Sequence, residues 1–72
     1  MTAETTPVEV DARGMRCPWP ALRAARSLRT HAAVLLRADD PIAEKELAAM
    51  AEEQGWFFEI RDKNLFFISR TA

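Results

Sequence analysis

The sequence predicts an α+β fold, a two-layer α/β sandwich of order β-α-β-α-β-β with two helices on one face of a four-stranded mixed sheet. Three observations predict it: a short alternating segment near the start, two segments with helical apolar spacing, and two apolar runs around a short polar turn at the end. A strand-helix-strand unit crosses over right-handed, so its two strands run parallel. The 72 residues make a single domain, expected over residues 7–70, with residues 1–6 as a flexible N-terminal tail.

The first half of the chain predicts a strand, a loop and a helix. Residues 7–11 alternate apolar and polar side chains after a proline, which is typical of a strand that begins with that residue. A helix is expected over residues 18–29, because proline is favoured at the first helical position, and this makes Cys17 the N-cap. At 3.6 residues per turn, one face of this helix is apolar and the opposite face is polar and aromatic. The inward set is Ala21, Ala24, Ala25 and Leu28, and the outward set is Trp19, Arg23, Arg26 and Thr30.

The second half predicts a buried strand, a helix and a hairpin. Residues 33–38 are apolar enough for a central strand. Asp39-Asp40-Pro41 indicates a helix start, an Asp N-cap followed by proline, and the helix continues to Gln54 before Gly55 ends it. Its inward residues are expected to be Ala43, Leu47, Met50 and Ala51. Residues 56–61 and 65–69 then form a hairpin around residues 62–64.

The last two strands are apolar on both faces, whereas two helices cover only one face of a sheet. Either Trp56, the tail and arginine stems cover part of the other face, or that face binds a second copy or a partner. We therefore expect a monomer or a weak dimer.

Charge is segregated along the chain although the net charge is −1. Residues 12–38 contain six arginines and no acid, whereas residues 39–59 contain seven acids and one lysine. Such segregation indicates either docking with charged partners or simply two solvated helix faces.

Cys17 is the only cysteine, and it lies between two arginines and two prolines. The positive end of the helix and the guanidinium of Arg13 or Arg16 favour the thiolate. Pro18 and Pro20 offer no N–H, so few backbone donors remain for the sulfur. A lone cysteine is more commonly a small buried apolar residue, but an N-cap beside arginines favours an exposed, functional thiol with a lowered pKa.

One thiol limits the chemistry. An internal disulfide and a dithiol redox cycle each need a second cysteine. His31, the only histidine, lies at the far end of the helix, roughly 18 Å away at 1.5 Å per residue, too far to serve as a base. We expect no metal and no cofactor. A single exposed thiolate can accept a group from one protein and pass it to another.

The chain shows neither a signal peptide nor an apolar run near the ~20 residues that cross a bilayer. Together with the single cysteine, this predicts a cytoplasmic protein with no membrane association.

The spacing Asp11-x-x-Gly14-x-x-Cys17-Pro18-x-Pro20, followed by Ala38-Asp39-Asp40-Pro41 and a hairpin ending near Arg70, resembles the TusA/SirA-type sulfur carriers over about residues 8–70. The resemblance implies the same β-α-β-α-β-β sandwich and a sulfurtransferase that carries a persulfide. The sulfur would come from a cysteine desulfurase or rhodanese-like donor and go to an acceptor protein. Family members supply tRNA thiolation, molybdenum-cofactor maturation or sulfur oxidation.

Carried over by position, the resemblance implies that Cys17 bears the sulfane sulfur, Pro18 and Pro20 shape its turn, and Asp11 and Gly14 set the preceding loop. It gives Asp39 and Asp40 a structural role at the start of the second helix. Residues 30–32 depart from the turn that many relatives have there, a change that affects partner choice rather than the thiol.

An outward Trp19 beside a reactive cysteine is a natural partner anchor, and Arg23 and Arg26 extend it into a stripe that suits an acidic partner patch. Alternatively, Trp19 only packs over Arg23.

Two other functions remain open. The first is a non-catalytic interaction or regulatory module that uses the basic first helix and the open sheet face. The second is nucleic-acid binding, since the family's fold resembles the C-terminal domain of translation initiation factor 3, but the acidic second helix and near-neutral charge argue against it.

Overall fold

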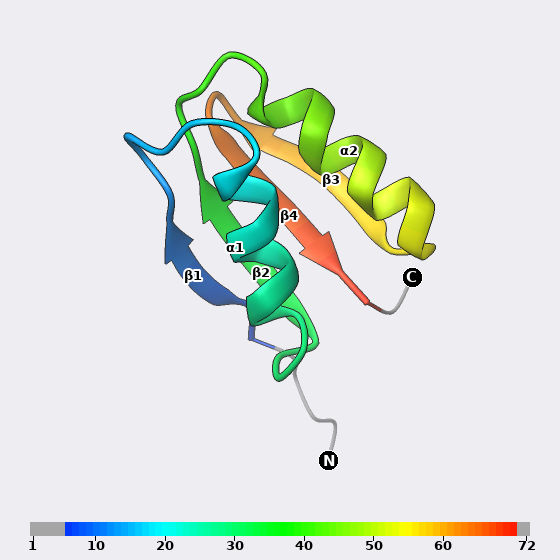
Figure 1. Ribbon diagram of the computed structural model, residues 1–72. Helices are drawn as coiled ribbons and strands as arrows, with labels where there is room; N and C mark the ends of the chain where they lie inside the picture. The colour runs from blue at the N-terminus through cyan, green and yellow to red at the C-terminus, as the bar shows by residue number, and fades with distance from the viewer. Residues whose placement is uncertain (1–5, 71–72) are drawn as a thin grey trace.

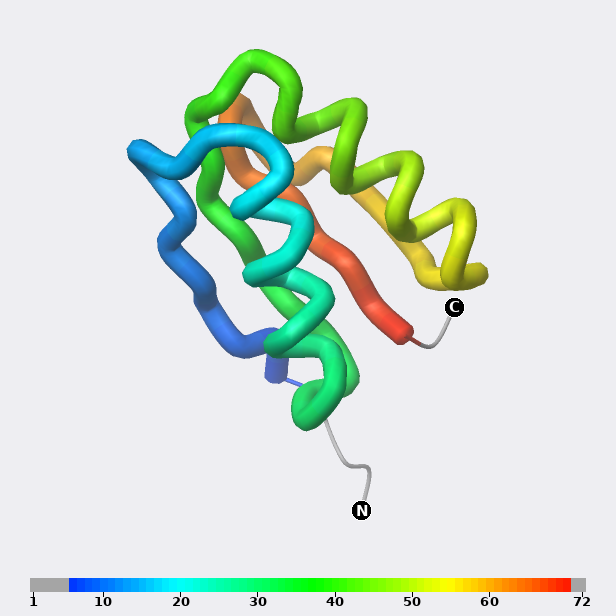
Figure 2. Tube along the Cα trace, in the orientation of Figure 1, coloured from blue at the N-terminus to red at the C-terminus, as the bar shows by residue number. Residues whose placement is uncertain are grey.

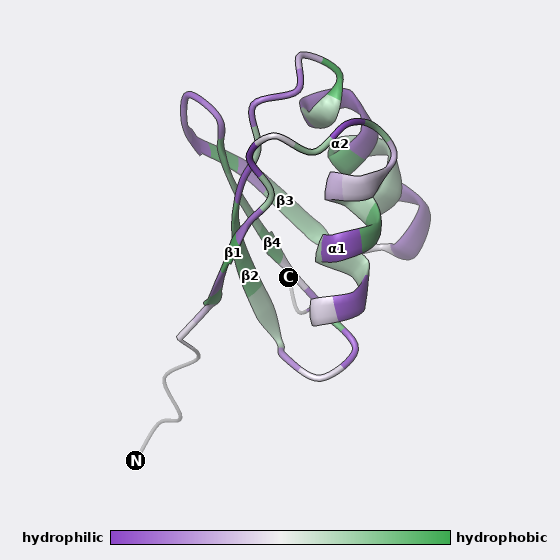
Figure 3. Cartoon of the chain, turned by 60° about the vertical axis from the view of Figure 1, so that its left-hand side comes forward, coloured by the Kyte–Doolittle hydropathy of each residue, from purple (hydrophilic) through white to green (hydrophobic). Residues whose placement is uncertain are grey.

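The computed structural model describes residues 6–70, and its elements follow the predicted order. They are β1 (Val8–Asp11), α1 (Trp19–Ser27), β2 (Ala33–Arg37), α2 (Ala43–Gln54), β3 (Phe57–Asp62) and β4 (Leu65–Ser69). Both helices lie on the same side of the four-stranded sheet (Figures 1 and 3), so the predicted two-layer α+β fold is confirmed. Of the predicted tail, residues 1–5 lie outside the described residues.

The strand order places two loops next to each other at one end of the sheet. The order is β1-β2-β4-β3, with β1 and β2 parallel, as predicted, and the other two pairs antiparallel. Asp11 at the end of β1 stands opposite Arg37 at the end of β2. Because parallel strands end at the same edge, residues 12–18 and 38–42 lie side by side (Figures 1 and 2). The candidate site forms between these two loops.

The core lies between the helices and the sheet (Figure 3). α1 contacts β1 and β2, and α2 contacts β3. The predicted inward faces are confirmed, except that Ala25 and Met50 are only half-buried. The largest fully buried side chains are Leu28, Leu36, Leu47, Ile68, Val34 and Pro20.

Both helices begin later than predicted. The N-cap of α1 is Pro18 and that of α2 is Ile42. The Asp40 carboxylate accepts the Ile42 N–H at 2.9 Å and the Asp40 carbonyl accepts the Ala43 N–H at 2.9 Å, so residues 40–43 form a turn before the helix. Gly55 ends α2 at φ 75°, as its predicted C-terminal position requires.

The sheet face opposite the helices carries an apolar strip. The Phe57 and Phe67 rings meet edge to face at 5.9 Å, and the Arg61 guanidinium lies 4.4 Å from the Phe67 ring centroid. The expectation that arginine side chains cover part of this sheet face is therefore confirmed for Arg61. Trp56, which was also expected to cover it, packs against the core instead. Phe57 remains 42% exposed. Across residues 6–70, neither helix has the length and apolar character of a membrane span.

Candidate functional site

Cys17 lies in the loop between β1 and α1 as a half-buried free thiol. The Trp19 N–H donates to the Arg16 carbonyl at 2.8 Å, and the Leu22 N–H donates to the Pro18 carbonyl at 3.1 Å. Helical hydrogen bonding therefore starts from Pro18, so the expectation that Cys17 is the N-cap is wrong. The Trp19 N–H, one of the few backbone donors that the two prolines leave near the sulfur, already has a partner.

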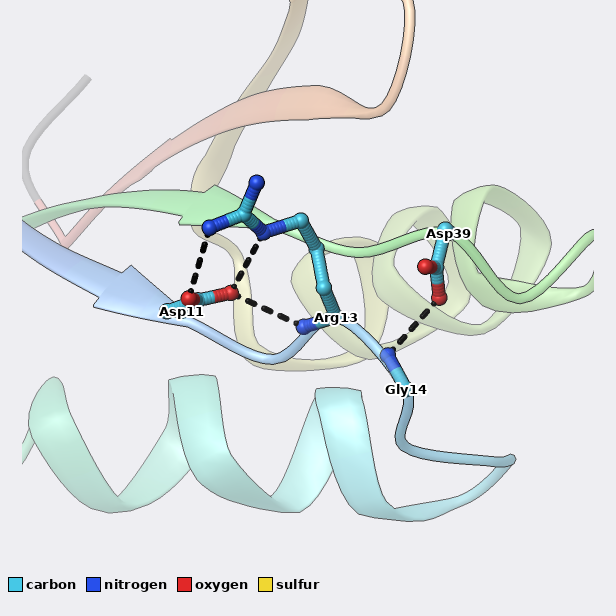
Figure 4. A network of polar contacts seen from close by, with 4 residues as sticks. All are labelled: Asp11, Arg13, Gly14 and Asp39. Atoms are coloured by element: carbon cyan, nitrogen blue, oxygen red, sulfur yellow. Dashed lines mark hydrogen bonds and ion pairs between the residues drawn. The ribbon is translucent and has the colours of Figure 1, made fainter.

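Two aspartates after β2 hold the Cys17 loop. One Asp39 oxygen accepts the Gly14 N–H at 2.9 Å (Figure 4). One Asp40 oxygen accepts the Cys17 N–H at 2.7 Å, and its other oxygen accepts the Ile42 N–H. These two backbone N–H groups, together with the nearby Arg16 charge, hold the pKa of Asp40 below its usual range. The aspartates thus join the two loops rather than only starting α2.

Asp11 and Arg13 form an exposed ion pair at the end of β1. The Arg13 Nε and backbone N–H donate to one Asp11 oxygen at 2.9 and 3.1 Å, and Nη2 donates to the other at 2.9 Å (Figure 4). These hydrogen bonds hold the pKa of Asp11 well below its usual range and raise the pKa of Arg13. Gly14 follows at φ 83°, a conformation that glycine adopts without a steric penalty. The Arg13 guanidinium is therefore engaged by a carboxylate.

The electrostatic surroundings of the thiol are acidic. Partial burial, a hydrogen bond with the Glu46 side chain, and the negative charges of Glu46 and Asp40 all raise the pKa of Cys17 above its ordinary value. The predicted lowering of this pKa is wrong, because Arg13 pairs with Asp11 and Arg16 acts on Asp40.

An apolar groove opens beside the thiol loop on the outer side of α1. It has a volume of about 350 Å³ and is lined by Met15, Trp19, Leu22, Arg23 and Arg26. Trp19 is 60% exposed and Leu22 is 51% exposed. The structure thus brings the three sequence-predicted contact residues of α1 together. Arg13 and Arg16 lie outside this groove.

The comparisons with known proteins agree with this geometry. The family model of sulfurtransferase TusA matches residues 8–69. The chain belongs to the TusA sulfurtransferase family. It is also similar to the crystal structure of a SirA-like protein from Desulfitobacterium hafniense, with a TM-score of 0.65 and 28% identity over 85% of this chain and 90% of that one. A comparison with curated proteins gives no match.

Membership of the TusA family implies a sulfur-carrier role, in which the protein interacts with sulfur-donor and sulfur-acceptor proteins. The resemblance drawn from the spacing around Cys17 is therefore confirmed at the level of the family and the fold.

The sequence reasoning missed Glu46, whose negative charge raises the pKa of Cys17 in this TusA-family protein. Glu46 lies three residues after the inward Ala43 and one before the buried Leu47, so the helical spacing placed it at the border of the apolar face. It is half-buried, whereas Glu44 and Lys45 are exposed. Its place at the border of the apolar face is the feature of the sequence that could have pointed to Glu46.

His31 lies beyond the C-terminal end of α1, where its Nδ1 is 3.0 Å from the Thr30 hydroxyl, whereas Cys17 precedes the N-terminal end. Within the described part of the chain, no three acidic, histidine or cysteine side chains gather in a way that could hold a metal ion.

Proposed function

We propose that this TusA-family protein carries sulfane sulfur as a persulfide on Cys17. It receives the sulfur from a cysteine desulfurase or rhodanese-like donor and passes it to an acceptor protein. The observation that carries the proposal is the position of the chain's one thiol, half-buried in a loop that Asp39 and Asp40 hold, beside an exposed apolar groove.

Persulfide transfer needs only one cysteine thiol on the carrier protein. Attack of the Cys17 sulfur on a donor persulfide forms one S–S bond and breaks another, with no external oxidant or reductant. A second cysteine would instead release the sulfur by forming an internal disulfide, and this chain has only one. A single thiol therefore suits holding sulfur between two proteins.

The groove supplies a docking surface for these partners. Met15, Trp19 and Leu22 form its apolar part. Arg23 and Arg26 lie at the same groove and make no ion pair within residues 6–70, so they are available to an acidic patch on a partner. An exposed tryptophan in an apolar groove is the typical anchor of such an interface.

The test is to incubate the protein with a cysteine desulfurase and cysteine and to measure its mass. We expect an added mass of one sulfur atom that dithiothreitol removes and that is absent from Cys17→Ser. Absence of the adduct from the wild type with several donors, or its persistence in Cys17→Ser, would reject the carrier role. Absence of the adduct from the wild-type protein would favour a non-catalytic interaction module.

A further inference from the structure

The edge strand β3 exposes apolar side chains on both of its faces. Among residues 6–70 it pairs only with β4, so it forms one edge of the sheet (Figure 1). Ile60 stands opposite the buried Phe66 and therefore lies on the helix side of the sheet, where it is 49% exposed. Phe57 lies on the opposite side, in contact with Phe67, and is also exposed. An edge strand with exposed apolar side chains is a template for pairing with another strand.

Glu59 and Arg61 flank Ile60 and carry opposite charges. The Arg61 Nε donates to a Glu59 oxygen at 2.6 Å, and the guanidinium lies over Phe67, the residue opposite Glu59. Both charged side chains therefore lie on the open side of the sheet, although a register shift separates Ile60 from Asp62. Arg61 and Glu59 are 45% and 48% exposed in this ion pair, so both can reach a second chain.

This order of charges selects one register of self-pairing. In an antiparallel pair of identical strands, facing residues point to the same side of the sheet, so the two-fold axis passes through a residue. An axis through Ile60 places Glu59 of each copy opposite Arg61 of the other, and the two Ile60 side chains face each other. An axis through Glu59 or through Arg61 places two like charges opposite each other, which is destabilising.

The other edge strand, β1, lacks this complementarity. An axis through Val10 would place Glu9 opposite Asp11 of the second copy, and an axis through Glu9 would pair two glutamates. Among the described residues, no large exposed apolar side chain lies in β1, whereas Phe57 and Ile60 both lie in β3. The edge suited to a second copy of this chain is therefore β3.

We propose that β3 binds β3 of a second copy in a symmetric dimer, antiparallel and centred on Ile60. The two four-stranded sheets then form one continuous sheet, and the backbone groups on the outer side of each β3 gain partners. Glu59 and Arg61 form two ion pairs across this interface. No residue of β3 lines the groove at α1, so pairing at β3 leaves the groove of each copy free. The inference therefore does not depend on the carrier function.

Sedimentation equilibrium between about 10 µM and about 1 mM should show a concentration-dependent equilibrium of wild-type monomer and dimer. Glu59→Arg and Arg61→Glu each replace two attractive pairs with two like-charge pairs and should weaken self-association roughly tenfold. Glu53→Arg and Arg29→Glu make the same changes of charge at exposed positions outside β3 and should leave self-association unchanged. A wild-type protein that stays monomeric at about 1 mM overturns the proposal. Equal weakening by the control variants also overturns it.

An equimolar mixture of Glu59→Arg and Arg61→Glu separates contact between copies from effects within one copy. The two variants carry opposite charges at the facing positions, so a heterodimer should form about as tightly as the wild-type dimer, although each variant alone associates more weakly. The ion pair within one copy is lost in both variants, so only contact between copies can produce this recovery. A mixture of Glu53→Arg and Arg29→Glu, with the same net charges, should associate as the wild type does. Absence of recovery in the first mixture counts against the proposed register.

A cross-link locates the two-fold axis. Facing residues on antiparallel strands have Cα atoms about 5 Å apart, which is within the range of a disulfide. Ile60→Cys in the Cys17→Ser protein should therefore form a covalent dimer on mild oxidation. Asp62→Cys in the same background, whose counterpart lies four residues away along the second strand, should form little covalent dimer. Equal cross-linking of both variants would overturn pairing around Ile60.

Discussion

The two helices contribute to the candidate site in different ways. α1 begins directly after the thiol loop, and its outer face presents Trp19, Leu22 and two arginines to solvent. The segment that leads into α2 supplies Asp40, 23 residues after Cys17, whose carboxylate accepts the Cys17 N–H, and the charge of Glu46 in α2 raises the pKa of the thiol. We propose that the helix next to the thiol in the sequence offers the surface for partners, whereas the more distant α2 segment holds the thiol loop and raises the pKa of the thiol.

The two oppositely charged segments of the sequence therefore lie at different parts of the candidate site. The arginine-rich segment of residues 12–38 places Arg23 and Arg26 at the groove, and the acid-rich segment of residues 39–59 places Asp40 at the Cys17 loop and supplies the negative charges that raise the pKa of the thiol. Alterations of α1 should therefore change partner recognition, and alterations of the α2 segment should change the reactivity of the thiol.

The largest effect is expected on stability, where the two helices are alike because each buries a leucine in the same core. Leu28 at the end of α1 and Leu47 in α2 are both fully buried in the same core. Leu28→Ala and Leu47→Ala should each lower the free energy of unfolding by about 3 kcal/mol, measured by urea denaturation. A loss below about 1 kcal/mol for either one would show that its helix does not share this core.

Next in size is the loss of the exposed anchor on α1. Trp19→Ala should slow sulfur transfer from a protein donor about 30-fold, the equivalent of about 2 kcal/mol for a central interface residue. Transfer from a cysteine desulfurase and uptake from glutathione persulfide are measured side by side. If both rates change by the same factor, Trp19 acts on the thiol loop and the division between the helices is wrong.

Reversal of the groove charges is expected to have a smaller effect. Arg23→Glu and Arg26→Glu should each slow transfer from a protein donor about tenfold at low salt, because each repels an acidic partner patch. The difference from wild type should shrink as salt is added. Arg29→Glu, an exposed change outside the groove, serves as the control, and an equal loss there would indicate a general charge effect.

The smallest expected effect concerns Asp40. Asp40→Asn removes one negative charge that raises the pKa of Cys17 and one acceptor for backbone N–H groups. The pKa of the thiol should fall, and iodoacetamide should alkylate it about threefold faster at neutral pH. Slower alkylation would mean that the hydrogen bond from Asp40, which positions the Cys17 loop, affects the reactivity of the thiol more than the negative charge of Asp40 does.

The local sequence was sufficient to predict the fold. Apolar spacing identified the buried faces of both helices, and Gly55 marked the end of α2 because a left-handed residue there favours glycine. The starts of the helices were less predictable. The sequence predicts a helix start at Asp39-Asp40-Pro41, but the Asp40 side chain closes a turn first and α2 begins at Ala43.

The sequence by itself determined the two-layer fold, the single thiol and the outward face of α1, because these follow from periodicity and composition within short segments. Only the tertiary structure decided the environment of that thiol. Parallel pairing of β1 with β2 brings Asp39 and Asp40 to the Cys17 loop, while the neighbouring Arg13 pairs with Asp11. Electrostatic effects on a pKa depend on distance in space, and here the charges that raise the pKa of Cys17, those of Asp40 and Glu46, come from a distant part of the chain.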